Sequence, residues 1–348
     1  MSQPNHIALQ IQKIIRETTD TKSFVLKNVS GKEIHYEAGQ FLSFVFENRN
    51  GAELRRSYSV SSSKILKESL QITVKRIPNG AYSRWLFDDA KEGDILQSTG
   101  ASGLFVLPVD LTKTSQLVFF AAGSGISPVF AMIKTVLHQS TQVSVKLIYS
   151  NRSPADTIFY NELKNLQEKF QDRLYIEFLF SAYSNTPRTR LNMGRIEEIA
   201  TKYFSPSPNT TLFYLCGPFD YMRMITIVLR TEGVPENAIR KEIFHVEKPV
   251  NKPVPPDILP HTIVAQYQNE TYTFISQYPQ TILQTAKANG IPLPYSCESG
   301  QCGTCAATCV SGKVFMWRNY VLLDEEIAKG RILTCTGYAV GGEVKLIY

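Results

Sequence analysis

The sequence lacks a hydrophobic run long enough to cross a membrane. Its longest apolar segment, residues 117–133, is interrupted by two glycines, two serines and a proline, whereas a spanning helix needs about 20 consecutive apolar residues. The first residues carry no apolar stretch typical of a signal peptide. We therefore expect a cytoplasmic protein without membrane insertion, in which residues 117–133 form a buried strand that leads into a helix.

Basic clusters and hydrolase motifs are also missing. The net charge of +6 comes from scattered lysines and arginines, with no run of five or six, and this argues against nucleic-acid binding. Neither H-E-x-x-H nor G-x-S-x-G occurs, and the five histidines are dispersed. The sequence therefore gives no sign of a zinc protease or a serine hydrolase.

Cysteine is scarce outside one region, residues 297–335, which holds five of the six. Disulfides are rare in a reducing compartment. Cys297, Cys302 and Cys305 are spaced C-x4-C-x2-C, and Cys335 follows after 29 intervening residues. This is the thiolate spacing of plant-type [2Fe–2S] ferredoxins, whereas zinc sites usually present two C-x2-C pairs. We predict these four cysteines as cluster ligands, with a zinc clip as the alternative, and expect Cys309 to be a small core residue.

The residues between these cysteines suit the same task. Ser299, Gly300, Gly303 and Thr304 are small, so the backbone can wrap closely and direct N–H groups at negatively charged sulfurs.

The rhythm of apolar residues predicts more than one domain. Residues 41–47 and 69–77 are typical of strands in a strand-rich domain. From about residue 116, continuous apolar runs alternate with helical stretches, which predicts βαβ units around a parallel sheet. The expected buried strands are 117–122, 143–150, 174–182 and 211–218, and residues 159–170 are expected to be helical.

A proline-rich segment marks the next boundary. Residues 247–260 contain five prolines in fourteen positions, which predicts a semi-rigid linker. Beyond it, we expect a hairpin around Asn269 and a short helix in 281–290 that ends at Gly290 in the left-handed region.

A glycine-rich turn follows the first buried strand of the second domain. In AAGSGISPVFAMI (121–133), Gly123 and Gly125 precede a helix that Ser127 would cap, with Pro128 at its first position. Backbone N–H groups at such a helix start can bind a dinucleotide pyrophosphate, although the same pattern occurs in ordinary strand–helix turns.

Three stretches resemble the ferredoxin–NADP reductase superfamily. RRSYSVSS (55–62) is similar to its R-x-Y-S signature, VKRIPNGAYS (74–83) to its second flavin segment, and YLCGP (214–218) to its C-G-P motif. The order and spacing of the three, with residues 121–133 between the last two, strengthen the resemblance. One departure is TGASGLF (99–105), where the family often has G-P-x-G-x-F, so we assign no cofactor role there.

The resemblance implies residue roles. Flavin contacts fall on Arg56, at the FAD pyrophosphate, and on Tyr58 and Ser59, beside the flavin ring. Cys216 lies near the nicotinamide. Tyr58, Ser59 and Cys216 are thus the candidate catalytic residues, and the other implied cofactor-binding residues are Lys75, Gly80, Ser83, Gly217 and Phe244, of which Phe244 could equally be a core residue.

Residues 261–348 resemble a β-grasp ferredoxin domain, with GRILTC (330–335) delivering the fourth cysteine. The whole chain is similar to the superfamily members with a C-terminal ferredoxin, such as the reductase component of phenylacetyl-CoA epoxidase and the reductase of hybrid-cluster protein. This implies an antiparallel β-barrel FAD domain at 1–110, an α/β NAD(P) domain at 111–246, the linker and the ferredoxin domain.

Electron counting predicts the order of transfer. NAD(P)H gives two electrons at once and a [2Fe–2S] cluster accepts one, so FAD must lie between them. We predict an NAD(P)H:acceptor oxidoreductase that serves a multicomponent oxygenase. The alternatives are a hybrid-cluster protein or soluble ferredoxin-like acceptor and, as a minor one, a redox sensor without turnover.

The second strand–helix turn predicts NADPH over NADH. Ser150 and Arg152 stand where a 2′-phosphate would arrive, and Arg188 and Arg190 follow the next strand. Arginine forms a charge-assisted fork with phosphate. Asp156 keeps NADH open, because an acidic residue can bind the 2′-hydroxyl.

Overall fold

A computed structural model describes residues 6–47, 53–182, 190–203, 211–244 and 252–348 of the protein. The chain divides into two units, one that ends at Phe244 and one that begins at His245, and each is described by itself. No helix in these described ranges is long and apolar enough to cross a membrane.

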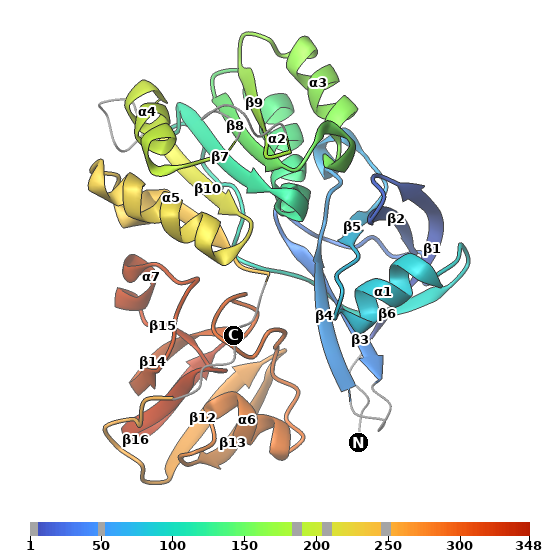
Figure 1. Cartoon of the computed structure of the whole chain (residues 1–348). Coiled ribbons are helices and arrows are strands. Elements are labelled where there is room, and N and C mark those ends of the chain that lie inside the picture. The colour runs from blue at the N-terminus through green and yellow to red at the C-terminus, as the bar shows by residue number, and fades with distance from the viewer. Residues whose placement is uncertain (1–5, 48–52, 183–189, 204–210, 245–251) are drawn as a thin grey trace. The chain divides into compact units, whose positions relative to one another are not determined.

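The first unit begins with an antiparallel sheet of six strands in the order β4-β3-β6-β1-β2-β5 (Figure 1). A bridge between Val60, which directly follows β4, and Ile72 of β5 joins the two edge strands. The sheet therefore closes on itself, as the barrel expectation required. Its elements are β1 (Ile7–Arg16), β2 (Thr21–Asn28), β3 (Phe41–Glu47), β4 (Glu53–Ser59), β5 (Gln71–Lys75), β6 (Ile95–Ser102) and the helix α1 (Ala81–Asp88).

The same unit continues into a parallel sheet in the order β11-β10-β7-β8-β9. The expected strands at 117–122, 143–150, 174–182 and 211–218 and the helix at 159–170 are confirmed. The elements are β7 (Gln116–Ala122), α2 (Ile126–Gln139), β8 (Ser144–Asn151), α3 (Tyr160–Lys169), β9 (Leu174–Phe180), α4 (Met193–Tyr203), β10 (Thr211–Cys216), α5 (Phe219–Thr231) and β11 (Ile239–Glu242).

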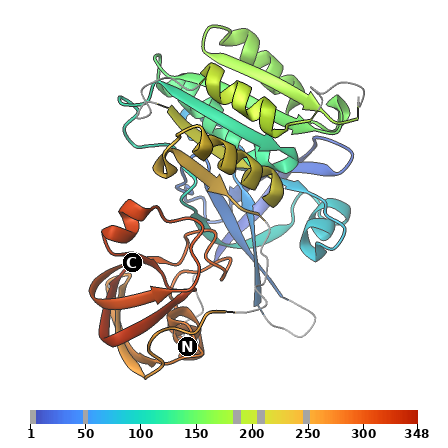
Figure 2. The ribbon, with the colours of Figure 1, turned by 60° about the vertical axis from the view of Figure 1, so that its left-hand side comes forward.

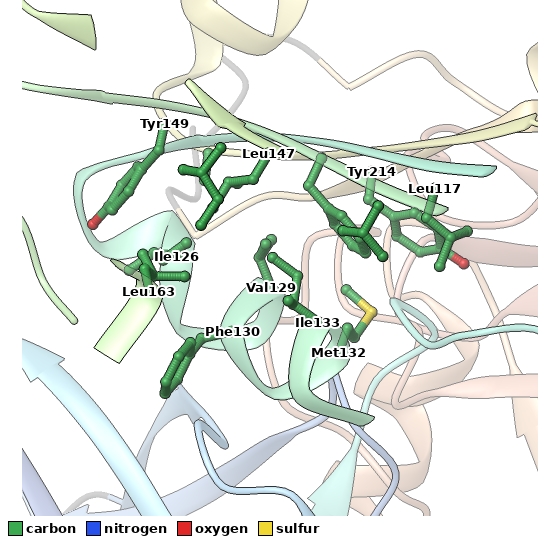
Figure 3. Packing of buried hydrophobic residues seen from close by; sticks show 14 of the residues in the cluster. Leu117, Ile126, Val129, Phe130, Met132, Ile133, Leu147, Tyr149, Leu163 and Tyr214 are labelled. Carbon is green, nitrogen blue, oxygen red and sulfur yellow. The ribbon is translucent and has the colours of Figure 1, made fainter. Parts of the chain in front are cut away.

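Strand β7 shows why its sequence is continuously apolar. Leu117 lies in a buried cluster with residues of α2 and α3 on one face of the sheet (Figure 3), and Phe119 belongs to the same cluster. The alternate residues Val118 and Phe120 pack with α4 and α5 on the other face, which Figure 2 brings forward. Both faces are covered by helices, so no position of the strand can be polar without a cost.

The barrel and the parallel sheet meet in a polar junction on α2. Lys134 is buried and forms an ion pair with Glu68, whose carboxylate also accepts a hydrogen bond from the Ser63 N–H at 2.7 Å. The hydroxyls of Ser63 and Thr135 are hydrogen-bonded to each other at 2.7 Å. These contacts join residues of the β4–β5 connection to α2, and thus fix the two sheets to each other within the first unit.

The second unit contains a mixed sheet in the order β13-β12-β16-β14-β15, with β12 and β16 parallel. The expected hairpin is confirmed, because Gln268 and Asn269 join β12 to β13 with φ values of 51° and 65°. The elements are β12 (His261–Tyr267), β13 (Glu270–Ser276), α6 (Ile282–Ala288), β14 (Ala306–Met316), α7 (Asp324–Ala328), β15 (Arg331–Leu333) and β16 (Gly337–Ile347).

Helix α6 follows its sequence signals closely. Thr281 accepts from the Gln284 N–H and the Gln284 side chain accepts from the Thr281 N–H, forming a capping box. The helix ends at Ala288, and Gly290 has a φ of +68° as expected.

The described half of the proline-rich segment, residues 252–260, has no helix or strand. The Asp257 carboxylate accepts from the backbone N–H of Gly341 at 2.8 Å and contacts His261 Nε2 at 2.7 Å. This half is therefore fastened to the second unit, and residues 247–251 lie outside the described ranges. The domain boundaries derived from the sequence remain predictions.

Candidate functional site

Three strands of the first unit end at one buried polar cluster. Ser59 is the last residue of β4, Cys216 of β10 and Glu242 of β11, and all three are buried. The Ser59 hydroxyl lies 3.4 Å from Glu242 Oε2, and the Cys216 sulfur lies 3.9 Å from the same oxygen. The structure thus brings together the candidate catalytic residues Ser59 and Cys216 from two different sheets, and adds a carboxylate between them.

Glu242 is the residue that sequence reasoning missed. Burial raises the pKa of its carboxyl to about 8, against a smaller lowering by hydrogen bonds from Ser59 and Cys216. Burial, together with the carboxylate of Glu242, also raises the pKa of the Cys216 thiol. The resemblance implies a role for Phe244, two residues further along the chain, but none for Glu242. Glu242 therefore holds its proton to higher pH than an exposed glutamate does, at the point where Ser59 and Cys216 meet.

The R-x-Y-S strand presents two different surfaces. Tyr58 is half-buried and lies 6.0 Å from Phe44, ring centre to ring centre, and burial raises the pKa of its hydroxyl. Arg56 is exposed and lies over the Tyr82 ring at 5.8 Å. Strand β4 therefore offers an aromatic residue, a hydroxyl and a guanidinium within four positions, which is a donor set that fits a flavin and its phosphates.

The turn from β5 into α1 carries the second flavin segment. Gly80 caps α1, and the Ser83 hydroxyl donates to the Gly80 carbonyl at 3.1 Å and accepts from the Ile77 N–H at 3.3 Å. The serine therefore shapes the turn, and the first N–H groups of α1 are the ones that could bind phosphate. Lys75 forms an ion pair with Asp20 at 3.2 Å, so its ammonium group has a partner within the barrel.

The glycine turn after β7 lies against the C-G-P turn after β10. A Cβ on Gly125 would stand 2.1 Å from the Cys216 carbonyl oxygen, and one on Gly217 would stand 3.0 Å from Ala122 Cβ. Gly123 has a φ of +54°. Only glycines allow these two strand–helix turns to approach so closely.

The predicted cap of α2 is wrong. The helix begins at Ile126 with Gly125 at its cap, so Ser127 and Pro128 both lie inside the first turn. Pro128 is tolerated there because first-turn N–H groups have no partner within the helix. Ser127 Oγ is buried without a hydrogen-bond partner among the described residues. An unpaired hydroxyl at a helix start fits a polar ligand such as a dinucleotide.

The end of β8 holds the residues expected near the adenosine. Ser150 Oγ is buried beside the Tyr221 hydroxyl, and Arg152 is exposed. Asp156 accepts a hydrogen bond from the Ser153 hydroxyl at 2.7 Å, so its carboxylate closes its own turn. Arg190 is exposed, whereas Arg188 lies outside the described residues.

Phe244 is 48% exposed. The alternative of a core phenylalanine is therefore wrong, and its ring is open to contact a ligand.

In the second unit, the four predicted ligand cysteines converge. The Cys302 and Cys335 thiols lie within hydrogen-bonding reach of Cys297 and lower its pKa, and Cys335 also reaches Cys305. The Ser299 N–H donates to the Cys297 sulfur at 3.4 Å, and Thr304 Oγ1 lies 3.4 Å from the Cys302 sulfur. Four thiols with nearby N–H and O–H donors are a donor set that fits an iron–sulfur cluster.

Across the described ranges, no group of three or more His, Cys, Asp or Glu side chains is arranged to hold a single metal ion. The cluster assignment rests instead on the convergence of the four thiols. Cys309 is only half-buried, and its sulfur faces the carbonyl groups of Ser311 and Gly312. The expectation that Cys309 is a core residue is therefore wrong, because β14 places it near the surface.

Comparison with known proteins matches all three parts of the chain. Residues 8–107 match an oxidoreductase FAD-binding domain, residues 119–226 an oxidoreductase NAD-binding domain, and residues 266–340 a 2Fe-2S iron-sulfur cluster binding domain. The fold and the site therefore define a flavin-dependent NAD(P)H oxidoreductase that carries its own [2Fe–2S] domain.

Relatives extend over almost the full length. The ferredoxin reductase component of 3-ketosteroid-9-alpha-monooxygenase from Mycolicibacterium smegmatis is 32% identical over 98% of this chain and 97% of its own. A component of the 1,2-phenylacetyl-CoA epoxidase of Escherichia coli is 30% identical over 97% of this chain and 96% of its own length. The solved structure of phthalate dioxygenase reductase matches with a TM-score of 0.61 and 26% sequence identity. The match covers 99% of this chain and 98% of that one. The chain belongs to this family of ferredoxin-type reductases, which pass electrons from NAD(P)H through FAD to a [2Fe–2S] cluster.

Glu242 gives a prediction about pH and stability. Between pH 4.5 and about 8, the unfolded chain has released this proton while the folded protein retains it. Stability contributed by the neutral carboxyl is complete below pH 4.5 and is lost as pH rises to about 8, by up to about 1.4 kcal/mol per pH unit. Glu242→Gln should remove this slope. Unfolding free energies from urea titrations at pH 5, 6.5 and 8 measure it.

Glu232→Gln, at the exposed end of α5, is the control for the replacement of any glutamate by glutamine. Its unfolding free energy should change with pH as that of the unmodified protein does. Parallel pH profiles for Glu242→Gln and the unmodified protein would show that Glu242 is ionised in the folded state.

Proposed function

We propose that the chain is the NADPH-dependent reductase component of a multicomponent oxygenase. The single observation that supports an oxygenase as the electron acceptor is the similarity, over nearly the full length, to proteins named as components of a monooxygenase and an epoxidase. A hybrid-cluster protein or soluble ferredoxin-like acceptor remains the second candidate.

We further propose roles for the residues of the first unit. Bound FAD supplies the conversion of two-electron to one-electron transfer. Tyr58 would lie against the flavin, Arg56 and the start of α1 at Gly80 would bind its phosphates, and Phe244 would cover the ring. Ser59 and Cys216, with Glu242 between them, would contact the reacting edges of flavin and nicotinamide and exclude water from them.

Replacing one predicted cluster ligand tests the proposal that electrons pass from the flavin to the [2Fe–2S] cluster in series. Cys302→Ser should lower cytochrome c reduction at least tenfold, because this acceptor would receive electrons from the cluster. Ferricyanide, which accepts directly from flavin, should be reduced at nearly the unmodified rate. Cys309→Ser removes a thiol outside the converging four and should leave both rates unchanged. Equal loss of both activities in Cys302→Ser would mean that flavin and cluster do not act in series.

The preference for NADPH is supported by the end of β8. The exposed Arg152 guanidinium has no hydrogen bond or ion pair among the described residues, while the competing Asp156 is bound to Ser153. Such a guanidinium can form a charge-assisted fork with the 2′-phosphate. We expect kcat/KM to favour NADPH, and Arg152→Ala to lower the NADPH/NADH ratio at least tenfold.

Arg190→Ala tests the second candidate arginine in the same assay, and Arg84→Ala, exposed on α1, controls for the loss of a positive charge. A ratio that favours NADH, or that Arg152→Ala leaves unchanged, would overturn the assignment.

Docking to the acceptor should depend little on salt. Residues 261–348 contain six Lys or Arg and six Asp or Glu, so this region has no net charge to steer a partner over long distances. Turnover with an oxygenase encoded beside this protein should change less than about threefold between low and physiological ionic strength. A steep fall would contradict the docking argument, and failure to reduce that oxygenase while cytochrome c is reduced would remove the partner assignment alone.

A further inference from the structure

A buried threonine links the two sequence segments that deliver the cysteines. Thr334 precedes Cys335 and is fully buried. Its hydroxyl donates to the carbonyl of Cys305 at 3.1 Å, and its backbone N–H reaches the same oxygen at 3.3 Å. One residue thus holds the loop that ends at Cys305 and the turn that carries Cys335, although 29 residues separate the two cysteines in the chain.

A tyrosine completes this link from the far side. The Tyr348 hydroxyl donates to Thr334 Oγ1 at 3.1 Å. Its backbone N–H donates to the Gln266 carbonyl at 3.1 Å, and its ring packs edge-on against Tyr267 with centres 5.8 Å apart. The tyrosine is therefore fixed at the parallel pair β12–β16, and its hydroxyl has a defined direction.

The hydrogen bonds run in one direction, from Tyr348 to Thr334 to Cys305. A threonine hydroxyl has a single proton to donate, and the bond accepted from tyrosine leaves that proton directed at the Cys305 carbonyl. Hydrogen bonds in such a chain polarise and strengthen one another in a low-dielectric interior. The Thr334 carbonyl also accepts from the Leu283 N–H at 3.1 Å, which ties α6 to the same point.

We propose that Thr334 and Tyr348 are positioning residues that fix the separation of Cys305 and Cys335 around the cluster. The proposal rests on the four-cysteine ligand set. Neither side chain would be a cluster ligand; each would act through the backbone of the segments that carry the cysteines. Loosening this link would let the two thiolates move apart. The [2Fe–2S] cluster would then be lost faster, and the electronic environment of its iron atoms would change.

The test uses the full-length protein with FAD and cluster bound. Thr334→Val removes the hydroxyl and should speed cluster loss in the presence of an iron chelator several-fold, followed by visible absorbance. It should also alter the EPR spectrum of the reduced cluster, which a change in distant packing would not do. Thr334→Ser keeps the hydroxyl and should restore both properties. Ferricyanide reduction should be unchanged throughout, because it reports on the flavin.

Tyr348→Phe should act in the same direction with a smaller effect, and it tests the proposal if Thr334→Val fails to fold. Since the tyrosine acts through the threonine, the double variant should match Thr334→Val alone rather than the sum of the two effects. Tyr272→Phe, on β13, is the matched control, because it removes a tyrosine hydroxyl that donates to Glu270 at 2.5 Å rather than to Thr334.

Unchanged EPR spectra and loss rates in both Thr334→Val and Tyr348→Phe would overturn the proposal. So would accelerated loss that Thr334→Ser does not restore. An error in the ligand set is recognised separately, since Cys305→Ser and Cys335→Ser would then retain full iron and acid-labile sulfide.

Discussion

The fixed junction between barrel and parallel sheet is the contact on which the reductase chemistry depends. Transfer between nicotinamide and flavin requires reacting atoms within about 3.5 Å, and the residues proposed for the two cofactors come from different sheets. Lys134 and Glu68, with Ser63 and Thr135, hold the barrel against α2. Because Lys134 is buried and needs Glu68 to pair its charge, a shift of the barrel along α2 would be costly. This keeps Ser59 beside Glu242.

The glycines near this junction serve the same geometry. Gly125 and Gly217 let the turns after β7 and β10 approach to distances that a side chain would forbid. The carboxyl ends of β10 and β11 are therefore aligned, with Cys216 of β10 paired to Glu242 of β11. The close approach of these two turns thus rests on backbone packing, and Ser59, Cys216 and Glu242 place buried polar groups at the same strand ends.

Much of this could be predicted from the sequence, because the informative signals are local. Each apolar run of the parallel sheet reflects a single strand, and three of the four predicted ligand cysteines lie within residues 297–305. Glu242 could not be recognised in this way, since its environment is created by Ser59, which is 183 residues away in the chain. The cap of α2 was misplaced because a serine before a proline is a common helix start. Here the cap is Gly125, at a position where a Cβ would stand 2.1 Å from the Cys216 carbonyl oxygen.

The division of the chain into two units follows from what each transfer demands. Exchange between nicotinamide and flavin is contact chemistry and needs the locked junction of the first unit. Transfer of single electrons tolerates a gap between donor and acceptor, so the cluster needs a rigid cage of its own rather than a fixed position against the flavin. The second unit supplies this cage internally: Asp257 fastens residues 252–260 to it, and Thr334 ties together the segments of Cys305 and Cys335. Both of these contacts join segments of the second unit that are far apart in the chain, and the second of them holds the cysteine-bearing segments without help from residues of the first unit.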